Sequence, residues 1–390
     1  VHRKAQAIID EFGLDMKSTD KVKDLSVAYQ QMVEIMKAYS RENLKMIAFD
    51  EPTASLSDSE IDSLFRIIRK LKAEGKVIIY VSHRMAEIRQ IADRVAIFKD
   101  GRFVGDSPMD AITDKELVKK MVGRDLGDVF SGLDRNKTVG DVVLEVKNLS
   151  SPFLKDASFQ VRAGEVVGFS GLVGAGRTEV VRAIIGADPR TGGKVFLNGK
   201  PLNCRTPHDA IVNGVVMVPE DRKLQGIIPR MSVGRNISIG SLDQITNRLG
   251  IVNTRREEQI GLEGKANFNI KTPDLEKPIV ELSGGNQQKA IVAREIDKNP
   301  ELLVAVQPTR GLDVGAIEYI HKQLVAQRDA GKAVLLVSLE LDEVMDVPDR
   351  ILVMYEGEIV GELDPKKTTV EELGLYMAGA KRKEKEAAAV

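Results

Sequence analysis

The chain has 390 residues, and its 57 lysines and arginines balance 58 aspartates and glutamates, so a net charge of −1 argues against nucleic-acid binding through bulk positive charge. The single cysteine, Cys204, excludes an internal disulfide framework and cysteine-rich zinc sites, and four scattered histidines disfavour a histidine-cluster metal site. No stretch approaches the roughly 20 apolar residues that a membrane-spanning helix requires.

The sequence repeats itself at a constant spacing, in which residue 337 corresponds to residue 81. Residues 81–89 (VSHRMAEIR) match residues 337–345 (VSLELDEVM), and residues 98–105 (FKDGRFVG) match residues 354–361 (MYEGEIVG). Such a period indicates two homologous units. In the first copy, the similarity begins near Leu25. In the second copy, well over 100 residues of the unit precede the corresponding Leu282. We therefore expect the first unit to lack its amino-terminal part in this chain.

The repeat and the composition predict the domain organisation. Residues 1–130 are expected to form the carboxy-terminal part of the first unit, and residues 131–141, rich in small and polar residues, to form a linker. Residues 142–380 are expected to form a complete second unit. The tail, residues 381–390 (KRKEKEAAAV), begins with charged residues and ends with small apolar ones, and we expect it to be disordered.

In the first unit, two predicted strands end at residues that can do chemistry. The apolar run of residues 46–49 leads into Asp50 and Glu51, a pair in which one carboxylate can orient Mg²⁺ and the other can orient or deprotonate water. The next strand, VIIYVS, leads into His83, whose imidazole could contact a terminal phosphate. The alternative for His83 is a strand-end histidine satisfied by the backbone.

The second unit alternates strand and helix patterns, which predicts a mostly parallel α/β sheet. Strands are expected at 142–150, at 157–170 with the turn RAGE in its middle, and later in the runs LLVAV, KAVLLVSL and RILVMYEGEIVGEL. A helix is expected after residue 177, ending at Gly186, and an amphipathic helix at 316–332, ending at Gly331.

Between the strand EVVGFS and the following helix, residues 171–178 read GLVGAGRT. This segment matches the phosphate-binding pattern G-x-x-x-x-G-K-[ST], except that arginine replaces lysine. Glycine amides and a helix N-terminus can surround phosphate oxygens, and the threonine hydroxyl can bind Mg²⁺. The alternative is an ordinary glycine-rich turn. The candidate nucleotide-binding residues are Gly171, Gly174, Ala175, Gly176, Arg177, Thr178 and Glu179, with Thr178 and Asp50 as candidate metal ligands.

A second candidate anion site is LSGGNQQ, residues 282–288, which offers a serine hydroxyl and glycine amides at a predicted helix start. The same place in the first unit reads LSVAYQQ, which has lost both glycines and is expected to bind phosphate less well. The second unit in turn has Val306 and Gln307 in place of the Asp–Glu pair, and Leu339 in place of His83. We therefore expect the second unit to bind nucleotide but to hydrolyse it poorly. The candidate residues of the second site are Ser283, Gly284, Gly285 and Asn286.

These motifs together resemble the ATPases of ABC transporters, over nearly the whole chain. More narrowly, GLVGAGRT, VPEDRKLQGIIP, LSGGNQQKAIVAREI and PTRGLDVGA resemble the tandem ATP-binding subunits of bacterial importers for monosaccharides and nucleosides. The first part of the chain is most similar to pentose and hexose importers, and the last hundred residues to the nucleoside branch. The resemblance implies an α/β P-loop NTPase fold with a mixed sheet and a helical signature subdomain, in one partial and one complete copy.

The resemblance also implies ATP and Mg²⁺ as cofactors, bound between the Walker motifs of one cassette and the signature of the other. One site would combine Asp50, Glu51 and His83 with the LSGGN segment, with Glu51 and His83 catalytic. The other would combine residues 171–178 with LSVAYQQ, and Glu220 and Asp313 would also contact nucleotide. The phosphate loop of the first unit would fall before residue 1, so we expect weak ATP binding and little or no turnover by this chain alone.

The resemblance further implies partners and a location. Transmembrane permease subunits would bind directly, a solute-binding protein indirectly, and cassette subunits could form a homodimer. Nucleic acid is not an expected partner, and the protein would lie peripherally at the cytoplasmic face of the cell membrane. Two alternatives stay open: a tandem ABC protein that acts on ribosomes or DNA, and a regulatory nucleotide-binding subunit without turnover.

Overall fold

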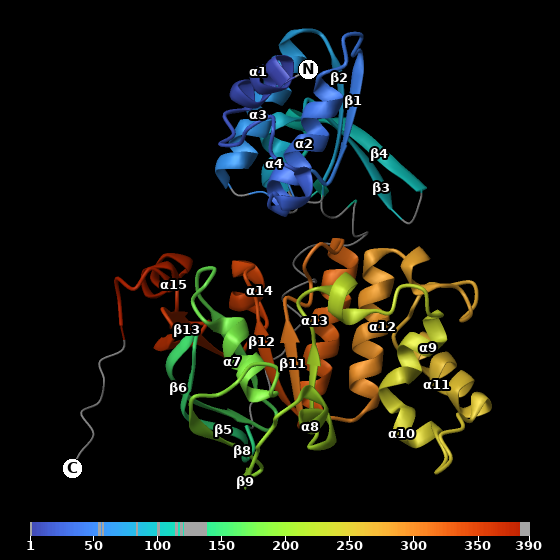
Figure 1. Cartoon of the computed structure of the whole chain (residues 1–390), viewed down its shortest axis with the longest axis vertical. Coiled ribbons are helices and arrows are strands. Elements are labelled where there is room, and N and C mark those ends of the chain that lie inside the picture. Colours follow the sequence, from blue (N-terminus) through green and yellow to red (C-terminus); the bar gives the residue numbers. More distant parts are fainter. Residues whose placement is uncertain are drawn as a thin grey trace. The chain divides into compact units, whose positions relative to one another are not determined.

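The computed structural model describes residues 2–53, 56, 58–82, 85–99, 102–113, 116, 117, 120 and 139–382. The chain divides into two compact units, unit 1 (residues 1–126) and unit 2 (residues 127–390), each described here by itself (Figure 1). Most of the expected linker and the tail from residue 383 lie outside the described residues. In the described part of the chain, no helix has the length and hydropathy needed to cross a membrane.

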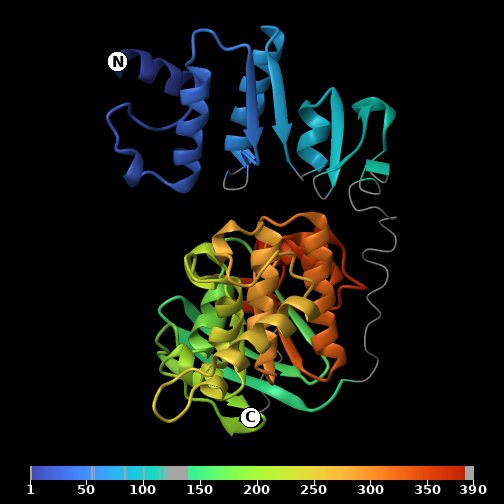
Figure 2. The ribbon, with the colours of Figure 1, turned by 90° about the vertical axis from the view of Figure 1, so that its right-hand side faces the viewer.

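The described residues of unit 1 include the helices α1 to α4 and two separate strand pairs. The parallel pair β1–β2 aligns Met46 with Val77 and Asp50 with Val81, and β3–β4 is an antiparallel hairpin (Figures 1 and 2). The elements are α1 (His2–Phe12), α2 (Val27–Tyr39), β1 (Met46–Asp50), α3 (Asp58–Ala73), β2 (Val77–Val81), α4 (Met85–Ile91), β3 (Arg94–Lys99) and β4 (Arg102–Pro108).

Within the described residues of unit 1, one face of the β1–β2 pair is covered and the other is exposed. Ile47 and Phe49 are buried against residues of α1, α2 and α3, because the period of two along a strand sends them to the same face. The alternate residues point the other way: Met46 and Val77 are each 57% exposed, Ile79 47% and Val81 49%. The predicted strand that leads into Asp50 is therefore buried on one side among the described residues of unit 1.

Unit 2 is built on a ten-stranded mixed sheet with the order β10-β11-β12-β7-β13-β14-β6-β5-β8-β9. The first five strands in this order are parallel, and the remainder is mostly antiparallel. The strands are β5 (Val142–Ser151), β6 (Leu154–Arg162), β7 (Val166–Ser170), β8 (Gly192–Leu197), β9 (Lys200–Pro201), β10 (Val215–Val218), β11 (Leu302–Val306), β12 (Ala333–Val337), β13 (Arg350–Tyr355) and β14 (Glu358–Leu363).

Helices cover both faces of this sheet, and a group of them extends beyond its β10 edge (Figures 1 and 2). The parallel part of the sheet needs such covering layers because every residue of β7, β11 and β12 is buried. The helices are α7 (Arg177–Ile184), α8 (Pro207–Val212), α9 (Val233–Ser238), α10 (Leu242–Ile245), α11 (Thr254–Asn267), α12 (Gly284–Asp297), α13 (Val314–Asp329), α14 (Leu341–Asp346) and α15 (Val370–Met377).

In unit 2, sequence patterns predicted the strands β5, β6, β7, β11 and β12 and the helices α7, α12 and α13, but not β8, β9 and β10 or the remaining helices. The run RILVMYEGEIVGEL, expected as a single strand candidate, is the hairpin β13–β14. The chain reverses at Glu356 and Gly357, whose φ angles are +47° and +80°, as a two-residue hairpin turn requires. The expected helix ends are confirmed, since Gly186 and Gly331 follow α7 and α13 in left-handed conformations.

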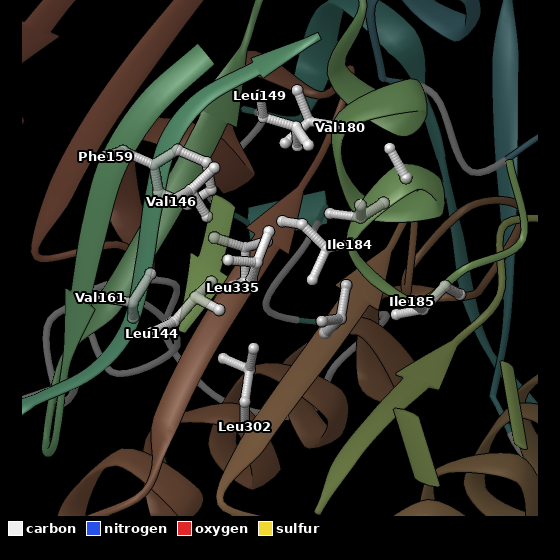
Figure 3. Close-up of a cluster of buried hydrophobic side chains, with 14 of the residues drawn as sticks. Leu144, Val146, Leu149, Phe159, Val161, Val180, Ile184, Ile185, Leu302 and Leu335 are labelled. Carbon is white, nitrogen blue, oxygen red and sulfur yellow. The ribbon is translucent and has the colours of Figure 1, made fainter. Parts of the chain in front are cut away.

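The core of unit 2 next to the phosphate-loop segment lies between α7 and the sheet. Val180, Ile184 and Ile185 of this helical segment are buried against Leu302 of β11 and Leu335 of β12, and Figure 3 shows these side chains converging. Together with β5 and β6, whose Leu144 and Val146 belong to the same cluster, the helix covers one face of β11 and β12. Through the repeat, this face corresponds to the exposed face of β1 and β2.

Candidate nucleotide-binding site

The loop between β7 and α7 requires glycine for steric reasons. A Cβ on Gly171, whose φ is +152°, would lie 2.5 Å from the carbonyl oxygen of Met354. Gly176, with φ +102°, begins α7 and approaches Gly357 so closely that a Cβ would lie 3.2 Å from that residue's Cα. The loop is thus held against the β13–β14 turn, and only glycine fits at these two positions without strain.

The N-terminus of α7 is open to an anion. Gly176 supplies no side-chain cap, and in the described structure no side chain caps this helix end. The first amides of a helix lack intrahelical acceptors, and the helix dipole favours negative charge there. Gly171, Gly174, Ala175, Gly176, Arg177, Thr178 and Glu179, predicted to bind nucleotide, are brought together in this loop and first turn, the arrangement that binds phosphate in other proteins.

Arg177, which stands where the pattern has lysine, turns inward. It is only 7% exposed, and its Nη1 donates a hydrogen bond of 3.0 Å to the backbone carbonyl oxygen of Ser338, just after β12. Burial lowers the pKa of Arg177, whereas Glu220 and Glu179 act to raise it. Its guanidinium therefore ties the phosphate loop to the end of the neighbouring strand.

A cavity of about 240 Å³ lies beside Thr178. The Oγ1 of Thr178 lies 3.5 Å from Oε2 of Glu220, and the other oxygen of Glu220 lies 3.4 Å from Nη1 of Arg310. The predicted pair Thr178 and Glu220 is thus brought together by the structure. The cavity is lined by Thr178, Arg182, Met217, Glu220, Asp221, Gln225, Val306 and Arg310.

A larger hollow of about 570 Å³ lies at the opposite end of β13, around Arg350. The guanidinium of Arg350 already bonds Glu165 at 3.0 Å, Glu362 at 2.7 Å and the carbonyl oxygen of Gln160 at 2.8 Å. These charges satisfy one another, so the smaller cavity beside the phosphate loop is the better candidate site.

The ends of β1 and β11 share one backbone conformation. Glu51 and its repeat counterpart Gln307 have φ angles of +45° and +48°, and their amides donate to the carbonyl oxygens of Val81 and Val337 at 2.9 Å and 2.8 Å. Such left-handed non-glycine residues are uncommon and concentrate at functional sites. The structure places Asp50, exposed, and Glu51 at the carboxyl end of β1, whereas His83 lies outside the described residues.

At the corresponding end of β11, the side chains differ. Val306 is fully buried, and the side-chain oxygen of Gln307 accepts a hydrogen bond of 3.3 Å from the amide of Leu339. Valine offers no oxygen to a metal, and the amide of glutamine is a negligible base. This strand end therefore keeps the geometry of its counterpart in unit 1 without its acid–base chemistry.

The LSGGN segment forms the start of α12. Ser283 is the N-cap residue, and the side-chain amide of Asn286 donates to its Oγ at 2.9 Å. A Cβ on Gly285 would lie 2.9 Å from Cβ of Ala316 and 3.3 Å from the carboxylate of Asp313, which itself caps α13. Gly285 thus lets the two helix starts approach closely.

The structure groups the predicted nucleotide-binding residues of unit 2 into two sets. Glu220 lies with the phosphate loop. Among the described residues that line the cavity beside Thr178, none comes from the LSGGN segment or from Asp313. The second set, at the starts of α12 and α13, comprises Ser283, Gly284, Gly285, Asn286 and Asp313.

Sequence reasoning missed a buried carboxylate that recurs in both units. In unit 1, Oε2 of Glu87 accepts hydrogen bonds from the hydroxyl groups of Thr53 at 2.9 Å, Tyr80 at 2.8 Å and Ser82 at 3.2 Å. Glu87 thereby connects the loop after β1 to the end of β2. The first of these segments follows Glu51 and the second precedes His83, the two expected catalytic residues. The match of VSHRMAEIR to VSLELDEVM was the signal that could have revealed it.

The same connection exists in unit 2. Glu343 is 3% exposed and accepts a hydrogen bond from Oγ1 of Thr309 at 3.0 Å, and His321 Nε2 lies 2.8 Å from the same oxygen. Glu343 and Thr309 are the repeat counterparts of Glu87 and Thr53. A carboxylate that fixes the loop after the strand is therefore common to both units.

Comparisons with known proteins agree with this geometry. Residues 154–310 match the model of the ABC transporter family. The chain is 45% identical, over 372 residues, to an arabinose import ATP-binding protein, AraG, of Mannheimia succiniciproducens, covering 95% of this chain and 74% of that protein. It is 43% identical, over 369 residues, to a putative ribose/galactose/methyl galactoside import ATP-binding protein of Rhizobium etli, covering 94% of this chain and 70% of that protein.

Solved structures support the fold alone. A nucleotide-free ATP-binding cassette from an ABC transporter matches with a TM-score of 0.51 and 22% identity, covering 60% of this chain and 99% of the cassette. The protein cbiO1 of Clostridium perfringens, part of an ABC transporter complex, matches with a TM-score of 0.50 and 21% identity, covering 62% and 95% respectively. With the two sugar-import relatives aligned along nearly its whole length, the chain belongs to the ABC transporter ATP-binding proteins.

Proposed function

We propose that this protein is the ATP-binding, energy-coupling subunit of a bacterial importer of simple sugars. The observation that carries the proposal is the identity of 45% and 43% to proteins named for arabinose and ribose/galactose import, over 95% and 94% of the chain. These names favour sugar over nucleoside as the cargo. The protein would act at the cytoplasmic face of the membrane on permease subunits, supplied with sugar by a solute-binding protein.

The two units would be tandem cassettes. This is supported by the elements themselves, since the bounds of β1, α3 and β2 coincide, through the repeat, with those of β11, α13 and β12. The strand register is also preserved: Met46 pairs with Val77 as Leu302 pairs with Ala333.

The first cassette would be completed by a segment that precedes these residues in a longer parent chain. The argument rests on the exposed face of β1 and β2, formed by Met46, Val77, Ile79 and Val81. Their counterparts in unit 2 are buried in a cluster that contains α7, the helix that follows the phosphate loop, together with residues of β5 and β6. A helix of the same kind, with its own phosphate loop, would cover the apolar face in unit 1, which soluble proteins seldom leave bare.

The parent protein would then have unequal nucleotide sites. Glu51 would act as the general base, with His83 contacting the terminal phosphate. Mg²⁺, when bound, would neutralise phosphate charge, and the exposed carboxylate of Asp50 at the end of β1 is an oxygen donor of the type that this ion prefers. Ser283, Gly284 and Gly285 would contact a nucleotide held on another cassette, as the family's pairing implies. Unit 2, without carboxylates at residues 306 and 307, would bind nucleotide and turn it over slowly or not at all.

The test has two parts, both on the complete parent protein. First, Glu51→Gln should lower phosphate release by about 100-fold or more, as loss of a general base does, whereas the matched change Gln307→Ala should leave it nearly unchanged. Unimpaired turnover by Glu51→Gln would refute the assignment of the base.

Second, uptake of radiolabelled arabinose, ribose and galactose should be compared with uptake of nucleosides in cells with and without the gene. Loss of uptake of one of the sugars is the expected result. Loss of nucleoside uptake alone would refute the proposed cargo while leaving the ATPase assignment standing.

A further inference from the structure

The donor set beside the phosphate loop of unit 2 fits Mg²⁺ poorly. Mg²⁺ requires near-octahedral oxygen coordination and is usually held by one or two carboxylates together with phosphates and water. Val306 places a buried isopropyl group where unit 1 has the carboxylate of Asp50.

The acidic residues that do line the cavity are already engaged. The Oδ1 of Asp221 accepts hydrogen bonds from the amides of Lys223 and Leu224, both at 2.9 Å. Glu220 lies within ion-pair distance of Arg310. Thr178 therefore contributes a hydroxyl and Glu220 a single carboxylate, whose oxygens lie 3.5 Å from Thr178 and 3.4 Å from Arg310.

Arg310 occupies a position at which the two copies of the repeat differ in charge. Its counterpart in unit 1 is Ala54, so the unit that has lost the strand-end carboxylate has gained a cation four residues later. The amide of Arg310 donates to the carbonyl oxygen of Gln307 at 3.2 Å, which closes a tight turn at the end of β11. Compared with unit 1, the segment after β11 therefore lacks a metal-ligating carboxylate and has a guanidinium that lines the cavity.

Arg310 is also the arginine best placed to meet a phosphate. Arg177 is buried and bonds Ser338, and Arg182 forms two hydrogen bonds to Asp188, at 2.7 Å and 2.6 Å. The side chain of Arg310 is 54% exposed, and its 3.4 Å contact with Glu220 is longer than a strong charge-assisted hydrogen bond. A guanidinium has five donors and matches phosphate oxygens in pairs.

We propose that unit 2 binds a nucleoside triphosphate with Arg310 in the place of Mg²⁺, so that binding at this site does not require a divalent metal. The inference rests on the proposed function, because it takes unit 2 to be a nucleotide-binding cassette. It adds the identity of the counter-cation. It also gives a physical reason for a site that retains nucleotide without turnover.

The experiment measures the affinity of the 390-residue chain for a fluorescent ATP analogue, in excess Mg²⁺ and in EDTA. For the wild-type chain the two affinities should agree within about threefold, since only a guanidinium and amides are required. Arg310→Ala should weaken binding by about 10-fold or more in EDTA, the effect of losing a charged phosphate contact. Arg255→Ala, which changes an exposed arginine on α11 that does not line the cavity, is the matched control.

A reciprocal variant tests the exchange of cations directly. Val306→Asp combined with Arg310→Ala restores the unit 1 residue types and should make binding depend on Mg²⁺ by about 10-fold or more. Circular dichroism checks that this buried substitution folds, and Arg310→Ala alone decides the question if it does not.

Three results would overturn the inference. Loss of wild-type binding in EDTA would show that Thr178 and Glu220 hold a required metal. Equal affinities for Arg310→Ala and Arg255→Ala would show that Arg310 is not the counter-cation. Absence of wild-type binding in both buffers would instead refute nucleotide binding by unit 2, and with it this part of the proposed function.

Discussion

A pair of matched substitutions tests whether the face of β1 and β2 is bare in this chain and covered in the parent. Leu335 of β12 is fully buried in a cluster formed with α7, β5 and β6 (Figure 3). Its repeat counterpart, Ile79, is 47% exposed. Truncating a buried leucine to alanine removes transfer energy and leaves a cavity, so Leu335→Ala should destabilise unit 2 by about 2–5 kcal/mol. Ile79→Ala removes a half-exposed side chain and should cost unit 1 less than about 1 kcal/mol.

The assay is hydrogen exchange read by mass spectrometry along a urea titration. Peptides that contain β2 and β12 then report the unfolding free energy of each unit separately, which one global signal from two units would not do. In the parent protein, the same Ile79→Ala change should become about as costly as Leu335→Ala, because the proposed helix would bury residue 79. A loss above about 2 kcal/mol for Ile79→Ala in the 390-residue chain would refute the reasoning, as would a small loss in the parent.

Three further predictions concern single sites. Gly171→Ala should weaken nucleotide binding and lower the melting temperature, because the added Cβ would lie 2.5 Å from a backbone carbonyl oxygen; unchanged binding of a fluorescent nucleotide would contradict the described loop. Tyr80→Phe should destabilise unit 1 by about 1–3 kcal/mol, the cost of losing a hydrogen bond to the buried Glu87 carboxylate, as measured by hydrogen exchange of β2. Arg182 holds the pKa of Asp188 below its ordinary value, so the pair stabilises the fold above the unfolded pKa of about 4 and loses this contribution as the pH falls through the lower folded value. Acid titration of unit 2 stability should therefore be flatter in Asp188→Asn than in the wild type, and parallel curves would count against the ion pair.

Local patterns in the sequence were enough to locate the phosphate loop and the repeat. The loop could be predicted because its glycines are required by the backbone itself, as the φ angles of Gly171 and Gly176 show. Strand ends were predictable for a related reason: an apolar run that stops at a polar residue, as at Asp50, marks the edge of a parallel sheet. Two further nucleotide-binding candidates, Ser283 and Gly285, were recognisable as a helix start.

Other features depended on contacts between residues far apart in the sequence. Arg177 reads as a phosphate-binding cation, yet the structure buries it and directs it to Ser338, 161 positions away. The Glu87 network and the pairing of Arg310 with Glu220, 90 positions apart, likewise arise only when neighbouring strands bring their following loops together.

By itself, the sequence determined the phosphate loop, the repeat and the central strands of unit 2, because steric limits and hydrophobic period act within a few residues. Only the tertiary structure decided which of these segments are covered and which charges meet. The strands of the two units have matching boundaries and similar apolar character, but Leu335 is buried and Ile79 is half exposed. That difference depends on whether other elements lie over the strand, as α7, β5 and β6 do in unit 2, so burial is a property of the neighbours rather than of the strand.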